Sequence, residues 1–262
     1  MNKQNSLITR YCLAVVVMLA LLGPLAQNGR GSFVLHNDEQ LTVNESHYSG
    51  VLYDRSRVFI VPGGDIYIRL TANDSSGVDI SGGHVSDLYA YNYSVVDISG
   101  GDVGVLDAFD SSTVDISGGY VGHLWALGSN AVNLSGGSVS DLDADGSSVV
   151  DISGGSMDIL DAGGSSTVNI SGGYVSELKA DGYSEVTFYG RDFRVGGGLT
   201  LDGDRVLGTG FLSGEWFDGT GWIMTITNNY PTATILAIPE PATLLLLGFG
   251  AVMLRKRRYY CS

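Results

Sequence analysis

One short motif recurs seven times between residues 75 and 192 with a constant, 18-residue period. Four copies read Val-Asp-Ile-Ser-Gly-Gly, and the other three are variants of it. The copies begin at Val78, Val96, Val114, Val132, Val150, Val168 and Val186. Repetition at a fixed period of this size predicts a solenoid, in which each copy forms one coil and buries its few apolar side chains by stacking on its neighbours.

Within a copy, the apolar residues fall into two short strands. With Ser75 counted as position 1, position 4 is always Val and position 6 is Ile, Leu or Phe, with a polar residue between them in every copy. This alternation is the period of a strand with one buried face. Position 14 is Leu and position 16 is Ala in the first six copies, which predicts a second strand. Ser-Gly-Gly between the strands, and Gly, Asn, Asp and Ser between copies, favour tight turns.

The fold class expected from this pattern is all-β: a single-stranded parallel β-helix, or β-solenoid, with an 18-residue coil and helical signal and sorting segments at the two ends. A left-handed β-helix of hexapeptides would need apolar residues at every sixth position, whereas positions 4, 10 and 16 read Val, variable and Ala. Calcium-binding nonapeptides would need Gly-Gly twice in each period, and leucine-rich repeats are longer. We therefore expect a right-handed β-helix.

The chain between Gln27 and Ile238 is strongly acidic, with 8 basic and 27 acidic residues and a net charge of −19. Such a surface repels nucleic acids and anionic lipids, so no nucleic-acid partner is expected. The two cysteines, Cys12 and Cys261, lie in the terminal segments. The body therefore has no cysteine for disulfides, thiolate metal sites or catalysis, and we expect no cofactor and no metal site.

The start of the chain has the pattern of a secretory signal. Lys3 and Arg10 precede an apolar run from Cys12 to Leu22, which is short for a transmembrane helix; an N-terminal membrane anchor is the alternative. The domain organisation expected from these patterns is a signal peptide (1–31), an N-terminal cap with a degenerate coil (32–74), the seven repeats (75–192), a C-terminal β cap (193–230), a linker (231–238) and a sorting signal (239–262).

Both flanks of the repeats carry weaker versions of the pattern. Leu70 lies one full period before Leu88, but the interval from Gly63 to Gly82 is longer by one, which indicates an atypical coil with an inserted residue. On the other side, two apolar stretches flank Asp218-Gly219-Thr220-Gly221, which predicts a hairpin that closes the C-terminal end. Solenoids need such modified ends, because an unpaired terminal coil offers its edge to other chains.

The C-terminal tail combines three features in a fixed order. Pro239, Glu240 and Pro241 precede an apolar run from Ala242 to Leu254. Four basic residues follow it, Arg255, Lys256, Arg257 and Arg258. Thirteen helical residues reach only about 20 Å, which is short of a bilayer core, although an ordinary C-terminal membrane anchor is an alternative.

This arrangement resembles the PEP-CTERM sorting signal of exported bacterial proteins. The resemblance implies that the tail holds the precursor in the inner membrane, that an exosortase recognises Pro239, Glu240 and Pro241 and removes the helix, and that the protein is delivered to the cell surface or its exopolysaccharide. The basic flank would hold the end of the helix on the cytoplasmic side.

Two surface columns are candidates for binding. The first is polar and outward-facing at position 5: Asp79, Asp97, Asp115, Asn133, Asp151, Asn169 and Thr187. We expect it to be a solvated face rather than a calcium site, because it lacks the Asp-x-Asp-x-Asp-Gly loop. The second holds aromatic residues beside carboxylates, with Tyr89 and Trp125 at position 15 as possible glycan contacts.

Catalysis finds little support in the sequence. Carboxylates lie near one another in any chain with a column of Asp, so their proximity does not indicate glycoside hydrolysis. A polysaccharide lyase needs cationic side chains to neutralise a uronate, and the only basic residues between positions 75 and 192 are Lys179 and Arg191. The function expected is an exported, exosortase-sorted structural protein of the cell surface or extracellular matrix, associated with exopolysaccharide. A glycan-binding adhesin and a β-helical polysaccharide-acting enzyme are the alternatives.

Overall fold

The computed structural model describes residues 31–239, and these form strands and turns without a helix. The strands before the repeats are β1 (Phe33–Leu35), β2 (Gln40–Val43), β3 (Ser46–Leu52), β4 (Arg57–Ile60) and β5 (Asp65–Ala72). Those of the repeats are β6 (Gly77–Ala90), β7 (Val95–Asp110), β8 (Thr113–Gly128), β9 (Ala131–Leu134), β10 (Ser138–Gly146), β11 (Val149–Ala162), β12 (Thr167–Ala180) and β13 (Glu185–Gly197). The last are β14 (Thr200–Asp202), β15 (Arg205–Leu207), β16 (Gly210–Glu215), β17 (Gly221–Asn229) and β18 (Thr234–Pro239). The predicted helical signal and sorting segments lie outside the described residues.

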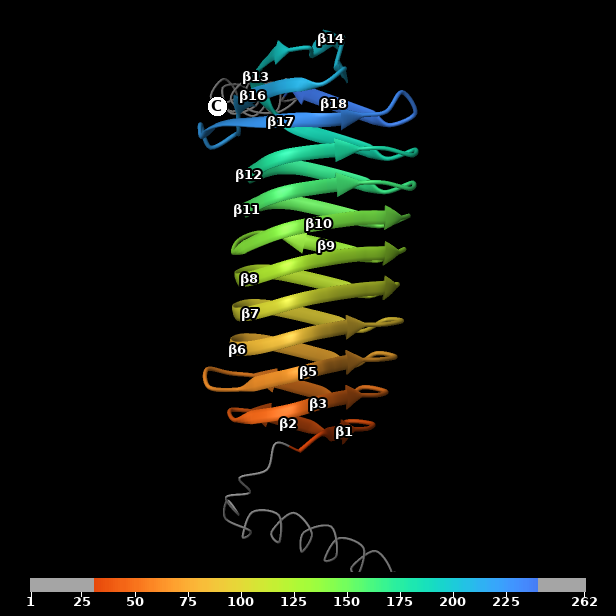
Figure 1. Ribbon diagram of the computed structural model, residues 1–262, viewed down its shortest axis with the longest axis vertical. Helices are drawn as coiled ribbons and strands as arrows, with labels where there is room; N and C mark the ends of the chain where they lie inside the picture. Colours follow the sequence, from red (N-terminus) through yellow and green to blue (C-terminus); the bar gives the residue numbers. More distant parts are fainter. Residues whose placement is uncertain (1–30, 240–262) are drawn as a thin grey trace, which may run out of the picture. The chain divides into compact units, whose positions relative to one another are not determined.

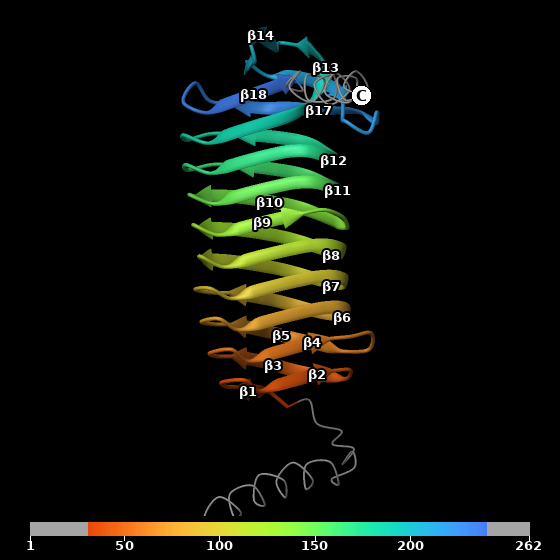
Figure 2. The ribbon, with the colours of Figure 1, turned by 180° about the vertical axis from the view of Figure 1, so that it is seen from behind.

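The strands wind into about nine coils that stack along one axis (Figure 1). Neighbouring coils pair in parallel, and the pairing of β7 with β8 aligns Val96 with Val114 and Leu106 with Leu124. The prediction of a parallel β-solenoid with an 18-residue coil is therefore confirmed. The front strands rise from left to right in Figure 1 and again from behind in Figure 2, so the winding is right-handed.

Apolar columns fill the inside of the stack. One coil contributes Val96, Ile98, Val103, Leu106 and Ala108, and all five side chains are buried. Because each of these residues lies against its equivalent in the next coil, the core is continuous although no coil has a core of its own. The periodicity of positions 4, 6, 11, 14 and 16 thus translates directly into five inward columns.

The Ser-Gly-Gly corners allow the coils to approach closely. The backbone φ of Gly119 is 76°, and a Cβ there would lie 2.7 Å from the carbonyl oxygen of Gly101 in the coil below. A side chain is therefore excluded both by backbone conformation and by space. The register between coils shifts at this corner and recovers by position 10, so the columns stay aligned.

A column of buried polar residues at position 2 was not predicted. Its members are Ser76, Ser94, Ser112, Asn130, Ser148, Ser166 and Ser184, and all are buried. Asn130 is the exception in residue type, and its Nδ2 donates to the carbonyl oxygen of Ala108 at 2.8 Å. Five of the serine hydroxyls are buried without a hydrogen-bond partner among the described residues, those of Ser76, Ser94, Ser112, Ser148 and Ser166.

The coils before residue 75 stack in the same way as the repeats. The pairing of β5 with β6 aligns Leu70 with Leu88, one period on, but Asp65 with His84, one position further than a period. The inserted residue is absorbed by an irregularity in the pairing between Ile66 and Leu70. The columns of positions 4 and 6 therefore continue to Leu41 and Val43, whereas His47 and Gly50 replace the apolar residues at positions 11 and 14.

The C-terminal end is closed by antiparallel strands. β16 and β17 form a hairpin around residues 216–220, and β16 pairs in antiparallel orientation with the end of β13. β17 also pairs in parallel with β12, so the hairpin continues the stack.

The prediction of a linker at residues 231–238 is wrong, because most of this segment is strand β18. β18 pairs in parallel with β13 from Thr234, opposite Glu185, to Pro239, opposite Gly190. Ile235 and Ala237 are buried, so the segment alternates inward and outward residues as a strand with one buried face does. The burial of alternate side chains provides the driving force that a linker would lack.

Candidate functional site

Position 15 of the repeats forms a column on the outside of the stack that begins with the predicted glycan contacts. β6, β7 and β8 align Tyr89, Asp107 and Trp125 in successive coils, about 4.8 Å apart. Figure 1 shows these strands one above another in the lower half of the stack. The structure thus places Tyr89 and Trp125 on one face, two coils apart, with a carboxylate between them.

Asp107 is held in an unusual position for a carboxylate. The residue is only 6% exposed, and its Oδ1 is buried without a hydrogen-bond partner among the residues that the structure describes. Burial raises the pKa of Asp107 above its ordinary value, and the nearby Asp87 raises this pKa further. A buried acceptor without a donor costs free energy, and because Oδ1 is buried, a ligand hydroxyl could reach it only if the neighbouring side chains moved.

Tyr89 and Trp125 are both fixed by their neighbours. The guanidinium of Arg69 lies 4.7 Å from the centre of the Tyr89 ring. The ring of Tyr91 is stacked on the Tyr89 ring, with 6.3 Å between the ring centres. The Trp125 indole N–H donates to Asp143 in the next coil. Phe109 extends the cluster by stacking on Tyr91 at 4.8 Å. Fixed aromatic rings with polar neighbours suit the apolar and hydroxylated faces of a sugar.

The position-5 column is an exposed or half-buried face from Asp79 to Asn169, and each of its carboxylates has an arginine or amide partner. The prediction that Thr187 also faces outward is wrong, because this residue is buried. Arg57 lies at the N-terminal end of the column, 2.7 Å from Asp79 and 3.4 Å from Asp97. The two amides of the column donate to the carboxylates beside them, Asn133 to Asp115 at 2.6 Å and Asn169 to Asp151 at 2.8 Å. Burial, together with the charges of Asp79 and Asp115, raises the pKa of Asp97.

A second group of carboxylates surrounds a small hollow of about 200 Å³ on the outside of the last repeats. The aspartates that line it are Asp143, Asp145, Asp161 and Asp181. Burial raises the pKa of Asp161, and the charges of Asp143 and Asp181 add to this effect. Within residues 31–239, no cluster of His, Cys, Asp and Glu has the geometry to hold a metal ion.

The tail begins directly at the folded end of the stack. Pro239, the first residue of the predicted recognition motif, is the last residue of β18 and lies opposite Gly190 of β13. Glu240, Pro241 and the basic flank from Arg255 to Arg258 lie outside the described residues. The strand leads the chain to the motif with no intervening loop.

Residues 237–258 match the model of the PEP-CTERM protein-sorting motif. The chain carries a PEP-CTERM sorting motif. The match begins at Ala237, within β18, and ends at the last arginine of the basic flank. The PEP-CTERM motif indicates an exported protein that is anchored transiently by its C-terminus and sorted by an exosortase. No curated protein and no solved structure matches the chain.

The PEP-CTERM tail lies partly inside and partly outside the described residues. No helix within residues 31–239 is long and apolar enough to cross a membrane, and the apolar run at 242–254 lies outside this part of the chain. The PEP-CTERM motif also overlaps β18, a relation that the sequence pattern did not predict. The alternation of Ile235 and Ala237 was the available signal for that strand.

Proposed function

We propose that the mature protein is a non-enzymatic structural rod of the cell surface or extracellular matrix, associated with exopolysaccharide. The observation that carries this proposal is the direct continuation of an uninterrupted stack of about nine coils into a PEP-CTERM motif. Nine coils at the spacing of neighbouring strands are about 43 Å long. A rod of this kind, exported and released by sorting, suits a passive role in an extracellular layer.

The acidic surface also supports an extracellular structural role. Between Gln27 and Ile238 the chain carries a net charge of −19, and its carboxylates are distributed in columns along the stack. Exposed charges of one sign along the strands oppose lateral association of rods. Separate rods would remain dispersed in a hydrated polymer.

The aromatic face supports the association with polysaccharide. Tyr89 and Trp125 lie on one face, and the carboxylate of Asp143 follows Trp125 in the same column. A sugar unit presents both an apolar face and hydroxyl groups, so the two kinds of side chain match it. An array of three coils would contact more than one unit of a chain.

The test compares the protein in two exosortase-bearing hosts, one with and one without exopolysaccharide synthesis. We expect the mature protein to sediment with the polysaccharide of the first host and to appear free in the medium of the second. The same distribution in both hosts would contradict the association. A purified sample that cleaved polysaccharide would instead favour the enzyme alternative.

The second candidate function is a glycan-binding adhesin, which the alignment of Tyr89 and Trp125 in one column favours specifically. A structural rod needs no row of aromatic side chains, whereas a glycan-binding site gains from fixed rings. The double substitution Tyr89→Ala and Trp125→Ala should then abolish binding on a glycan array. Tyr183→Ala is the matched control, because Tyr183 is exposed on the same stack and is far from these coils in sequence. Equal loss in the control would argue against a specific site.

A further inference from the structure

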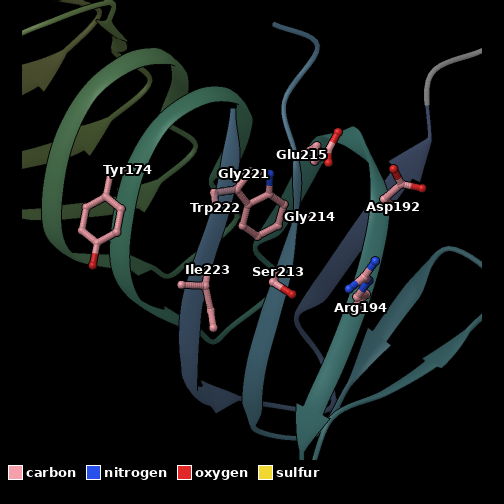
Figure 3. A pocket seen from close by; sticks show the side chains of 9 residues that line it. All are labelled: Tyr174, Asp192, Arg194, Ser213, Gly214, Glu215, Gly221, Trp222 and Ile223. Atoms are coloured by element: carbon pink, nitrogen blue, oxygen red, sulfur yellow. The ribbon is translucent and has the colours of Figure 1, made fainter. Parts of the chain in front are cut away.

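A larger hollow lies on the outside of the C-terminal coils, away from the Tyr89 and Trp125 face. Its volume is about 410 Å³, and its lining residues come from four strands, β12, β17, β16 and β13 (Figure 3). These strands are adjacent because β17 pairs with β12, β16 with β17, and β13 with β16. The hollow therefore lies across a continuous sheet and has a backbone floor held by hydrogen bonds.

The hollow has an apolar side and a polar side. Tyr174 and Ile223 are 49% and 56% exposed, and they lie together at one side of Figure 3. Ser213 lies opposite Ile223 in the sheet, and Arg194 lies opposite Ser213, so the three residues form one row across neighbouring strands. Asp192 and Arg194 are at the other side of the view. A ligand that spans this row would contact apolar surface at one end and hydrogen-bonding groups at the other.

The wall between the two sides is rigid. Trp222 is only 7% exposed, and its ring stacks on Trp216 at 4.6 Å and on Phe188 at 5.5 Å. Gly214 leaves room beside it, since a Cβ at that position would lie 3.0 Å from Cζ2 of Trp222. The indole N–H of Trp222 is buried without a partner in the described part of the chain. A preformed wall of this kind lowers the entropy cost of binding.

The charges that line the hollow balance. Glu215 is neutralised by Arg191, whose Nε lies 3.2 Å from its Oε2. Within residues 31–239, the side chains of Arg194 and Asp192 have neither a hydrogen-bond nor an ion-pair partner. One free guanidinium and one free carboxylate suit a neutral ligand with several hydroxyls, because both groups can bind hydroxyls and neither sign dominates. An anionic sugar would gain little net attraction, because Asp192 would repel it while Arg194 attracts it.

We propose that this hollow binds a neutral hexose unit of a polysaccharide. The apolar face of the sugar ring lies against Tyr174 and Ile223, while its hydroxyls bind Arg194, Asp192 and Ser213. Aromatic stacking beside a few convergent polar groups is the usual composition of a small-molecule site, and the volume accommodates one or two sugar units. The site is separate from the Tyr89 and Trp125 face, and it goes beyond a general association of the rod with exopolysaccharide.

The test is titration calorimetry on the full chain in mild detergent, with cellotetraose and maltotetraose as neutral probes and tetragalacturonate as the anionic one. We expect saturable binding of at least one neutral probe. Tyr174→Ala should weaken it about tenfold, the effect of losing one aromatic contact. Tyr120→Ala is the matched control, because Tyr120 occupies the same position of the repeat three coils earlier and is similarly exposed. Arg194→Gln should also weaken binding while the circular dichroism melting curve is unchanged.

Several results would overturn the inference. These are binding of neither neutral probe, binding of the anionic probe alone, and equal losses in Tyr174→Ala and Tyr120→Ala. Binding that survives Tyr174→Ala but is lost in the double substitution Tyr89→Ala and Trp125→Ala would leave the polysaccharide association standing and remove the hollow. Loss in Tyr174→Ala alone, together with the same distribution of the wild-type protein in hosts with and without exopolysaccharide, would support the hollow and contradict the association.

Discussion

Deletion of residues 129–146 should leave a folded solenoid that is one coil shorter. β8 pairs with β9 and β10, which in turn pair with β11, and each pairing is offset by one full period of the repeat. Without the deleted coil, Val114 therefore meets Val150, and Leu124 meets Leu160, in the same register. The new junction of Gly128 with Ser147 also restores the usual buried serine, Ser148, to position 2 of the next coil.

The expected loss of stability follows from what the deleted coil contributes. It removes one of about nine coils, so the denaturant dependence of unfolding should fall by roughly a tenth, in proportion to the surface exposed. It also brings Asp115 against Asp151, because Asn133, which donates to Asp115 at 2.6 Å, is lost. Two carboxylates at the coil spacing repel by about 0.9 kcal/mol in water. Adding Asp151→Asn to the deletion should recover this amount.

The matched control deletes only strand β10, Ser138–Gly146, which is half of one period. An odd shift turns the inward residues of a strand outward, so every column after the deletion is disrupted. Urea unfolding followed by circular dichroism measures both deletions. Cooperative unfolding is expected for the deletion of a whole coil and not for the deletion of β10 alone. Equal unfolding curves would refute the 18-residue coil as the structural unit.

Three further outcomes are expected. Asn133→Asp should destabilise the fold by about 1–2 kcal/mol, and more at low salt, because it replaces an amide donor by a carboxylate between two others; a urea midpoint that does not move would contradict this. Burial raises the pKa of Asp161, so its ionisation opposes folding as the pH rises above the ordinary value of 3.8; Asp161→Asn should therefore raise the melting temperature at pH 7, and the gain should vanish as the pH falls toward 4. Replacing residues 239–241 by three alanines should trap the full-length chain in the inner membrane of an exosortase-bearing host, whereas mass spectrometry of the wild-type surface fraction should find no peptide beyond residue 241.

The coil length, the parallel register and the inward columns were predictable because seven equal copies sample the same environment. Val at position 4 recurs in every copy, and a residue type kept at fixed spacing in a stack faces the same neighbours in each coil. The aromatic face was predictable for the same reason, since Tyr89 and Trp125 share one position of the repeat. The contact of Arg69 with the Tyr89 ring was not predictable, because Arg69 lies outside the seven copies.

The C-terminal hollow could not be predicted, because its residues come from segments without a common period. Arg194, Ser213 and Ile223 meet only through antiparallel pairings, whose register depends on the hairpin turn rather than on the repeat. β18 was missed because its alternation is short and lies between Pro231 and Pro239, where proline also suits a linker. The burial of Ile235 in the stack shows that the segment is a strand and not a linker.

The overlap of β18 with the sorting motif limits where a protease can cut the chain without harm to the fold. Pro239 ends the strand and Ala242 begins the apolar run, so the two are joined by at most about 10 Å of extended chain. A cut within this interval leaves all the pairing of β18 with β13 in place. A cut before Thr234 would instead release the strand, unpair the outer edge of β13 and expose buried Val186 and Phe188 to water. The released protein would then expose an unpaired strand edge, which can pair with strands of other chains.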